Sequence, residues 1–242
     1  MKPKRIWELD AFRGICILGV LAVHLVYDMT QLYKILEWEY PVWFSFIKDW
    51  GGILFLLISG ISATLGSRSV RRGLIVLGCG LVITLVTFGL YKYANFHKSI
   101  LIYFGVLHCL GICMILWGLA KYLPTWLLAI LGVAIAAVGL YLEQQVYWNL
   151  PHWLMVFGFR YPWMMTSDYF PLMPHFGFFL IGAVVGRLVY AKKVTLLPMV
   201  NEKNFVIRFF TACGRHSLWI YLIHQPVFAG VLTLISQWRN QT

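Results

Sequence analysis

Long apolar runs alternate with short polar segments along the whole chain. Seven of these runs are long enough to be membrane spans, since about 20 apolar residues cross the hydrocarbon core of a bilayer. They lie near residues 10–28, 45–66, 73–92, 99–120, 123–142, 171–190 and 213–236. The pattern predicts an all-α integral membrane protein, a bundle of about seven transmembrane helices that forms a single domain over residues 1–242.

The composition supports a membrane protein and excludes a soluble domain. Hydrophobic residues make up 60% of the chain and charged residues only 12%, whereas a soluble domain carries about 25% charged residues. The net charge of +11 comes from Lys and Arg in the short segments between the apolar runs. This is the positive-inside pattern, so we expect membrane lipid and no nucleic acid as a partner. The five cysteines lie in or beside apolar runs and are expected to be free thiols.

The distribution of Lys and Arg also predicts the orientation of the chain. With the N-terminus in the cytoplasm, the inner segments hold fourteen of these residues and the outer segments hold six. Cytoplasmic segments of membrane proteins carry the excess of Lys and Arg, so the N-terminus is predicted inside and the C-terminus outside. We expect a multi-pass protein of the plasma membrane.

Single cysteines introduced at Lys193 and Gln241 test this topology. The last predicted span separates the two positions, so a membrane-impermeant maleimide should label them from opposite sides of the membrane. Labelling is compared between intact and permeabilised cells. If both positions are labelled from the same side, the odd number of spans is wrong.

The first apolar run carries four ionisable residues on one face. Arg13 and His24 are eleven positions apart, which places them within about 20° of each other on a helix. Asp10 and Asp28 fall within about 40° of the same face. An ionisable residue in a membrane segment is costly and faces a cavity or a partner, so this stripe is a candidate functional site. The alternative is a buried ion pair that only fixes helix packing.

Three histidines on three different runs reach the middle of the predicted membrane. His24 lies about 16 Å from the inner face, and His108 and His224 lie about 13 Å from the outer and inner faces, at 1.5 Å per residue. A histidine can act as a general base near neutral pH, or it can simply pack helices through hydrogen bonds. We predict that the three histidines face one interior space that is open to both sides of the membrane.

The last run has a second polar face. Ser217, Tyr221 and His224 follow one another at spacings of four and three, which places them on one side of a helix. Gln225 and Pro226 come next, and a proline there is expected to kink the helix or end it locally. Backbone groups freed in this way are tolerated in a membrane only inside protein or beside a wet cavity.

Two outer segments, residues 27–50 and 144–174, are rich in aromatic residues. Such residues form a belt at the membrane interface. The alternative is a lid over an outer pocket, whose rings stack on a sugar and whose Arg160 and Asp168 contact it. His175, after Pro174, would lie at the outer mouth of the sixth span.

Two inner features leave alternatives open. Residues 191–210 are basic, as the positive-inside rule requires, and could also hold an anionic cofactor. The motif Gly182-x-x-x-Gly186 is a small-residue contact face, either within the bundle or between two copies in a homodimer.

Three segments resemble those of known membrane enzymes. The pattern Leu9-Asp10-x-x-Arg13-Gly14, followed by His24, resembles the first-helix motif of transmembrane acyltransferases. The segments YFGVLH at 103–108 and SLWIYLIHQP at 217–226 are similar to bacterial members of the heparan-α-glucosaminide N-acetyltransferase catalytic-domain family. The resemblance covers nearly the whole chain.

The resemblance implies an acetyl-CoA-dependent N- or O-acetyltransferase. Acyl-CoA, usually acetyl-CoA, would enter from the cytoplasm, and its acyl group would pass to a glycan or amino-sugar acceptor outside; no metal is expected. By this resemblance His24 is the catalytic histidine, and His108 and His224 join it as catalytic candidates that complete either the acceptor side or the proton path. The residues expected to hold the donor are Asp10, Arg13, Arg215, Ser217 and Tyr221. Those expected to hold the acceptor are Asp28, Arg160, Asp168 and His175.

Two other classes of protein compete with this interpretation. A small-solute or proton-coupled transporter would use the same membrane-embedded charges to line its path. A structural subunit of a cell-envelope complex would use them only for packing. Binding of CoA distinguishes the enzyme from both.

Overall fold

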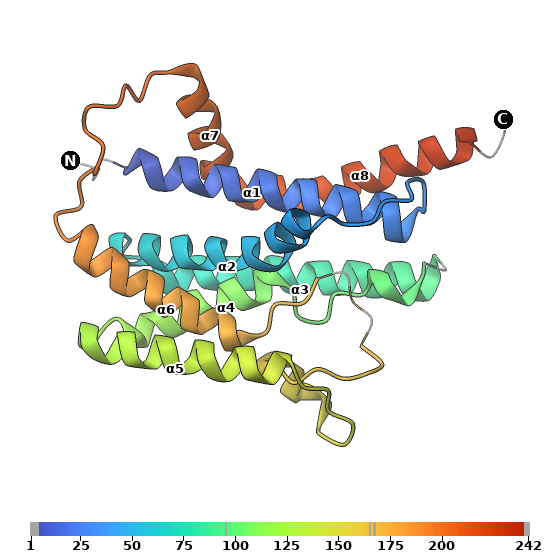
Figure 1. The fold of residues 1–242 in the computed structure, drawn as a ribbon, viewed down its shortest axis with the longest axis horizontal. Coiled ribbons are helices and arrows are strands. Elements are labelled where there is room, and N and C mark those ends of the chain that lie inside the picture. The colour runs from blue at the N-terminus through green and yellow to red at the C-terminus, as the bar shows by residue number, and fades with distance from the viewer. Residues whose placement is uncertain (1–4, 95, 165, 167, 240–242) are drawn as a thin grey trace. The chain divides into compact units, whose positions relative to one another are not determined.

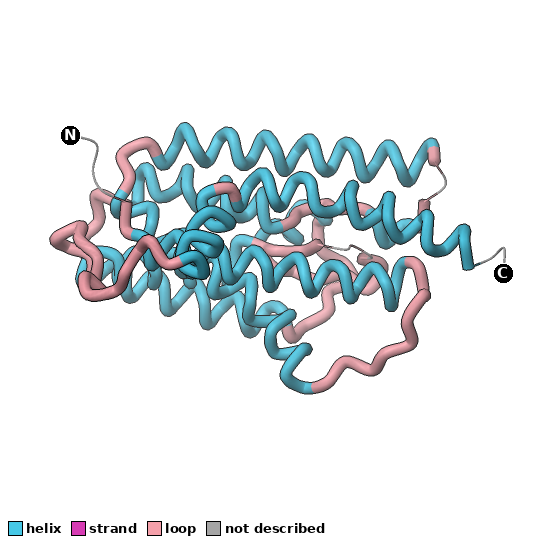
Figure 2. The backbone as a smooth tube through the Cα atoms, turned by 90° about the horizontal axis from the view of Figure 1, so that it is seen from above, coloured by secondary structure: helices cyan, strands magenta, loops and turns pink. Residues whose placement is uncertain are grey.

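The computed structural model describes residues 5–94, 96–164, 166 and 168–239, and almost all of the regular structure in these residues is helical (Figures 1 and 2). The all-α prediction is confirmed. The position Gln241, used in the labelling experiment above, lies outside the described residues. The longer helices are α1 (Trp7–Tyr27), α2 (Val42–Leu65), α3 (Ser69–Tyr93), α4 (Val106–Ala120), α5 (Thr125–Glu143), α6 (Leu172–Val189), α7 (Phe205–Arg215) and α8 (Ser217–Arg239). The shorter ones are η1 (Asp28–Leu32), η2 (Lys98–Ile100) and η3 (His152–Phe157).

Six of the described helices are long and apolar enough to cross a membrane, namely α1 with η1, α2, α3, α5, α6 and α8. The predicted span at 99–120 is shorter than expected, because regular helix begins only at Val106 and ends at Ala120. At 1.5 Å per residue, α4 is about 22 Å long, less than the roughly 30 Å of a hydrocarbon core. The count of seven spans and the cytoplasmic N-terminus therefore stay predictions.

Two features of the last quarter of the chain differ from expectation. The basic segment before the last span contains a helix of its own, α7, which ends at Arg215. Of the two outcomes expected at Pro226, a local end of the helix does not occur, since α8 continues through it to Arg239, and the kink stays a prediction. A proline removes one backbone hydrogen bond, and in α8 that loss does not interrupt the helix.

The chain divides into two compact units. Unit 1 consists of residues 1–55 and 193–242, and unit 2 of residues 56–192. The single domain over residues 1–242 stays a prediction.

In unit 1, helix α1 packs against both α7 and α8 (Figure 1). Helix α8 runs beside α1 in the same direction, and Tyr33 just after η1 donates a hydrogen bond to the carbonyl of Ala229 at 3.1 Å. Helix α7 lies across α1 near its N-terminal end (Figure 1). The chain therefore approaches α1 in α7, turns at His216 and follows α1 in α8.

A pair of glycines brings the backbones of α1 and α7 into direct contact. A Cβ added to Gly14 would collide with the carbonyl of Phe210, and one added to Gly214 would collide with the carbonyl of Asp10. Side chains at these two positions would force the helices apart. The contact is what places the end of α7 at Asp10.

In unit 2, α3 packs on α4 and α5 packs on α6. The small-residue motif of α6 is used within the chain. A Cβ on Gly182 would collide with the backbone of Leu57 in α2, and one on Gly186 would press on Ile61 and Thr64 of the same helix. Of the two alternatives for the motif, the structure supports packing inside the bundle.

Replacing Gly14 with alanine tests the contact between α1 and α7. Because the added methyl group has no space, Gly14→Ala should lower the free energy of unfolding by about 1–3 kcal/mol. Gly19→Ala is the matched control, since a Cβ there meets nothing within 4 Å. Thermal unfolding in detergent measures both variants, and equal loss of stability in the two would contradict the close contact.

Candidate functional site

The ionisable stripe of α1 faces the segment that forms α7 and α8. At its N-terminal end the buried carboxylate of Asp10 meets three guanidinium groups. Arg13 Nη1 lies 3.3 Å from Oδ1, and Arg215 Nε and Arg5 Nη1 lie 3.3 and 3.9 Å from Oδ2. These four side chains together carry two positive charges in excess. An anionic group is therefore favoured next to them.

About three helical turns further along α1, two histidines are in contact. Nδ1 of His24 and Nε2 of His224 are 3.1 Å apart. Nδ1 of His224 also contacts the carbonyl oxygen of Tyr221, which can only accept a hydrogen bond, so this nitrogen carries the proton. In the neutral pair, His224 Nε2 then accepts from Nδ1–H of His24.

This chain of hydrogen bonds fixes the tautomer of His24. With its proton on Nδ1, the other ring nitrogen, Nε2, carries a lone pair. No hydrogen bond joins that nitrogen to another of the described residues. His24 is only half-buried, so its Nε2 is able to accept a proton from a small molecule.

The stripe ends at Asp28, which is 3% exposed. Nε2 of Gln225 donates to Oδ2 of Asp28 at 2.8 Å, and Oε1 of Gln225 is a buried atom without a partner among the described residues. The ring of Tyr221 is buried 6.3 Å from the ring of His24, edge to face. Ser217 is the first residue of α8.

Unit 2 holds the third candidate histidine. His108 is buried in the first turn of α4, where Nδ1 accepts from the backbone N–H of Gly105 at 3.2 Å. Thr84 donates its hydroxyl to the carbonyl of Ile102 at 2.7 Å, so its oxygen accepts from His108 Nε2–H at 3.2 Å. Both ring nitrogens are thus used to hold the start of α4, which favours the packing alternative for His108.

His108 lies in unit 2, whereas His24 and His224 lie in unit 1. The single interior space expected for the three histidines therefore stays a prediction.

The candidate acceptor residues of unit 2 also make contacts within the protein. Oδ2 of Asp168 accepts from the backbone N–H of Val106 at 3.1 Å, a favourable place for a carboxylate because it is a helix N-terminus. His175 Nδ1 donates to the carbonyl of Pro171 at 2.8 Å. The guanidinium of Arg160 lies 6.0 Å from the ring of Tyr169.

The aromatic segment after α5 packs largely on itself. The ring of Trp163 stacks on Tyr161 at 5.3 Å and meets His152 edge to face at 4.8 Å. Burial raises the pKa of the Tyr169 hydroxyl, which donates to the carbonyl of Met155. These contacts are compatible with a belt and with a lid alike.

The five cysteines are free, as predicted. The sulfur atoms of Cys109 and Cys113 are 3.9 Å apart in the interior of unit 2. Within the described part of the chain, no three His, Cys, Asp or Glu residues are grouped so as to hold a metal ion.

Three residues of these sites were not predicted from the sequence. Arg5 precedes the first apolar run, where the positive-inside rule alone accounts for a basic residue. Gln225 follows His224. A polar side chain at that depth in a membrane span indicates a polar partner, but Gln225 served only to locate the expected kink at Pro226. Thr84 lies in an uncharged run and gives no signal of its own.

Comparison with known families decides the affiliation of the chain. The family model described as "Heparan-alpha-glucosaminide N-acetyltransferase, catalytic" matches residues 5–226. The chain belongs to this family. Neither a curated protein nor a solved structure gives a match. Membership of this acetyltransferase family, together with six apolar helices, makes the protein a multi-pass membrane protein related to transmembrane acetyltransferases.

Removal of the His108 ring tests its part in holding α4. His108→Ala should lower the free energy of unfolding by about 1–3 kcal/mol, because it leaves buried partners unsatisfied. His97→Ala is the control, since its side chain is exposed and, among the described residues, bonds only to nearby Ser99. Thermal unfolding in detergent compares the two, and a His108 variant as stable as wild type would contradict the packing role.

Proposed function

We propose that this protein transfers an acetyl group from cytoplasmic acetyl-CoA to an amine or hydroxyl of a sugar at the outer face. The observation that carries the proposal is the oriented pair His24–His224, which leaves a basic ring nitrogen of His24 facing outward from the pair. Because the chain belongs to an acetyltransferase family, we assign this nitrogen a role in acetyl transfer.

The arginine cluster at Asp10 suits the charged part of the donor. The phosphate groups of CoA are anionic, and arginine stays protonated in a protein, so Arg13, Arg215 and Arg5 offer fixed positive charge. Asp10 holds two of these guanidinium groups at 3.3 Å and thereby orients them. Eleven residues of helix separate Arg13 from His24, about 16 Å, which is close to the reach of the pantetheine arm. The acyl thioester would then lie at His24.

At the other end of this path His24 would act as the general base. Its Nε2 takes the proton from the acceptor amine or hydroxyl as that group attacks the thioester carbonyl carbon. The carbon–sulfur bond then breaks, and the proton passes to the thiolate of CoA. His224 accepts the Nδ1–H of His24 and holds the ring in the reactive tautomer, the part that an aspartate plays in a Ser-His-Asp triad.

A second route uses the same nitrogen as a nucleophile. His24 Nε2 would attack the thioester first, form an acetyl-histidine and release CoA, and the acceptor would then take the acetyl group. Direct transfer and this two-step route both require the tautomer that His224 fixes. They are separated by trapping: only the two-step route releases CoA before acceptor is added.

Substitution of His24 tests the catalytic role. His24→Ala should lower turnover by roughly 10²–10⁴-fold, the usual worth of a general base, while leaving the affinity for acetyl-CoA largely unchanged. His97→Ala is a control outside unit 1 and should retain wild-type turnover. Purified protein is assayed for acetyl transfer to an amino sugar, with donor affinity measured by calorimetry. Wild-type turnover in the His24 variant would leave only a packing role for the histidine pair.

Substitution of Arg13 tests the donor site. Arg13→Ala should weaken acetyl-CoA binding by roughly 10- to 100-fold, the loss expected for one charge-assisted hydrogen bond. Arg71→Ala removes an exposed arginine at the start of α3 and is the matched control. A wild-type protein that binds no CoA, yet shows pH-driven solute flux in proteoliposomes, would instead be the transporter.

A further inference from the structure

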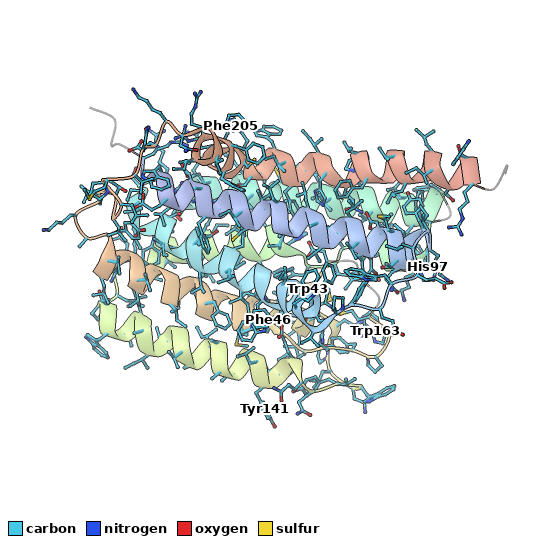
Figure 3. The ribbon with its side chains drawn as sticks, turned by 45° about the horizontal axis from the view of Figure 1, so that its top comes forward. Trp43, Phe46, His97, Tyr141, Trp163 and Phe205 are labelled. Atoms are coloured by element: carbon cyan, nitrogen blue, oxygen red, sulfur yellow. The ribbon has the colours of Figure 1, made fainter. Side chains whose placement is uncertain are left out.

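Helix α7 contributes Arg215 to the proposed donor site, but its outward face has no part in the proposed reaction. This helix carries three large apolar side chains that the protein leaves uncovered: Phe205 is 82% exposed, Val206 56% and Phe209 47%. Figure 3 shows Phe205 on the outside of the ribbon at the start of α7. In water such a surface would be unfavourable, so its environment must be apolar in part.

The residues of α7 divide into three faces at 100° per residue. Buried Thr211 and Gly214 share the side that packs on α1. Phe205 and Phe209 lie on the opposite side. Between the two lies a basic edge formed by Arg208 and Arg215, about 20° apart. An apolar face beside a basic edge is the pattern of a helix that lies in a membrane interface.

The position of α7 agrees with that pattern. It lies across α1 at the N-terminal end of that span (Figure 1), the end predicted to be cytoplasmic. A helix that projects sideways from the end of a membrane span enters the headgroup region of the bilayer. The glycine contact between Gly14 and Gly214 fixes α7 at this depth.

The charges around α7 indicate the kind of lipid. The exposed basic residues of this segment and its lead-in are Lys192, Lys193, Lys203, Arg208 and Arg215, against a single acidic residue, Glu202. Basic residues next to a membrane surface attract anionic headgroups. Lys203 precedes α7 and Arg208 lies on its basic edge, so both charges are near the phosphate level when Phe205 and Phe209 enter the acyl region.

We propose that α7 is an interfacial helix that binds the anionic surface of the cytoplasmic leaflet. Phe205, Val206 and Phe209 insert at the boundary between headgroups and acyl chains, and Lys203 and Arg208 contact lipid phosphates. The proposal concerns lipid binding alone and holds whatever reaction the protein catalyses.

Hydrogen exchange in nanodiscs tests the proposal on the full chain. The amides of residues 205–214 should exchange roughly tenfold more slowly when phosphatidylglycerol makes up about a third of a phosphatidylcholine bilayer, since anionic headgroups attract the basic residues Lys203 and Arg208. Lys203→Gln with Arg208→Gln should remove that difference. Arg68→Gln with Arg71→Gln makes the same change in net charge at the start of α3 and should keep it.

Phe205→Ser with Phe209→Ser tests the apolar face separately. Both side chains are largely exposed in the fold, so the variant should fold, as thermal unfolding in detergent will verify. In wild type, a phosphatidylcholine carrying a photoreactive group near the glycerol should crosslink within residues 205–213, and in the variant it should not. If the amides of α7 exchange at the same rate with and without phosphatidylglycerol, the preference for anionic lipid is wrong. If wild type gives no crosslinks within residues 205–213, the insertion of α7 into the bilayer is wrong.

Discussion

The free-energy cost of placing ionisable side chains in a membrane segment determines how the helices of unit 1 pack. Helix α1 and the short helix η1 that continues it carry Asp10, His24 and Asp28, none of which is stable against lipid on its own. Each meets a polar partner from the segment that forms α7 and α8: Arg215, His224 and Gln225, respectively. The polar stripe therefore sets the side on which α8 must pack and the direction in which it runs.

The histidines of this protein occupy two kinds of environment, one suited to proton transfer and one suited to holding a helix end. His224 uses one nitrogen on a backbone carbonyl and the other on His24, so the unused lone pair falls on His24. His108 uses both nitrogens on its own neighbours, Gly105 and Thr84. A ring whose nitrogens are both satisfied supports a helix end, whereas a ring with one nitrogen left over can take part in proton transfer.

Close backbone contact fixes the Asp10 end of the proposed reaction path within unit 1. Gly14 and Gly214 allow α7 to reach Asp10, and Arg215 follows directly after Gly214. The helix that offers its apolar face outward is thus the one that delivers an arginine to the Asp10 cluster. Small residues act in the same way in unit 2, where Gly182 and Gly186 bring α6 onto α2.

The sequence by itself determined the all-α class, the place of six of the apolar helices, the family and the polar stripe of α1. The fold class, the helices and the stripe follow from run length and helical periodicity, and the family follows from the resemblance of three short motif segments; all of these depend only on residues close together in the chain. The tertiary structure alone decided that Arg5 joins Asp10, that Gln225 binds Asp28, that His108 holds the start of α4 and that a separate helix precedes α8. Periodicity identifies the polar face of a helix, but the partner of that face comes from a segment some 200 residues away. The role of a histidine then depends on how many of its ring nitrogens such partners use, which only the folded chain fixes.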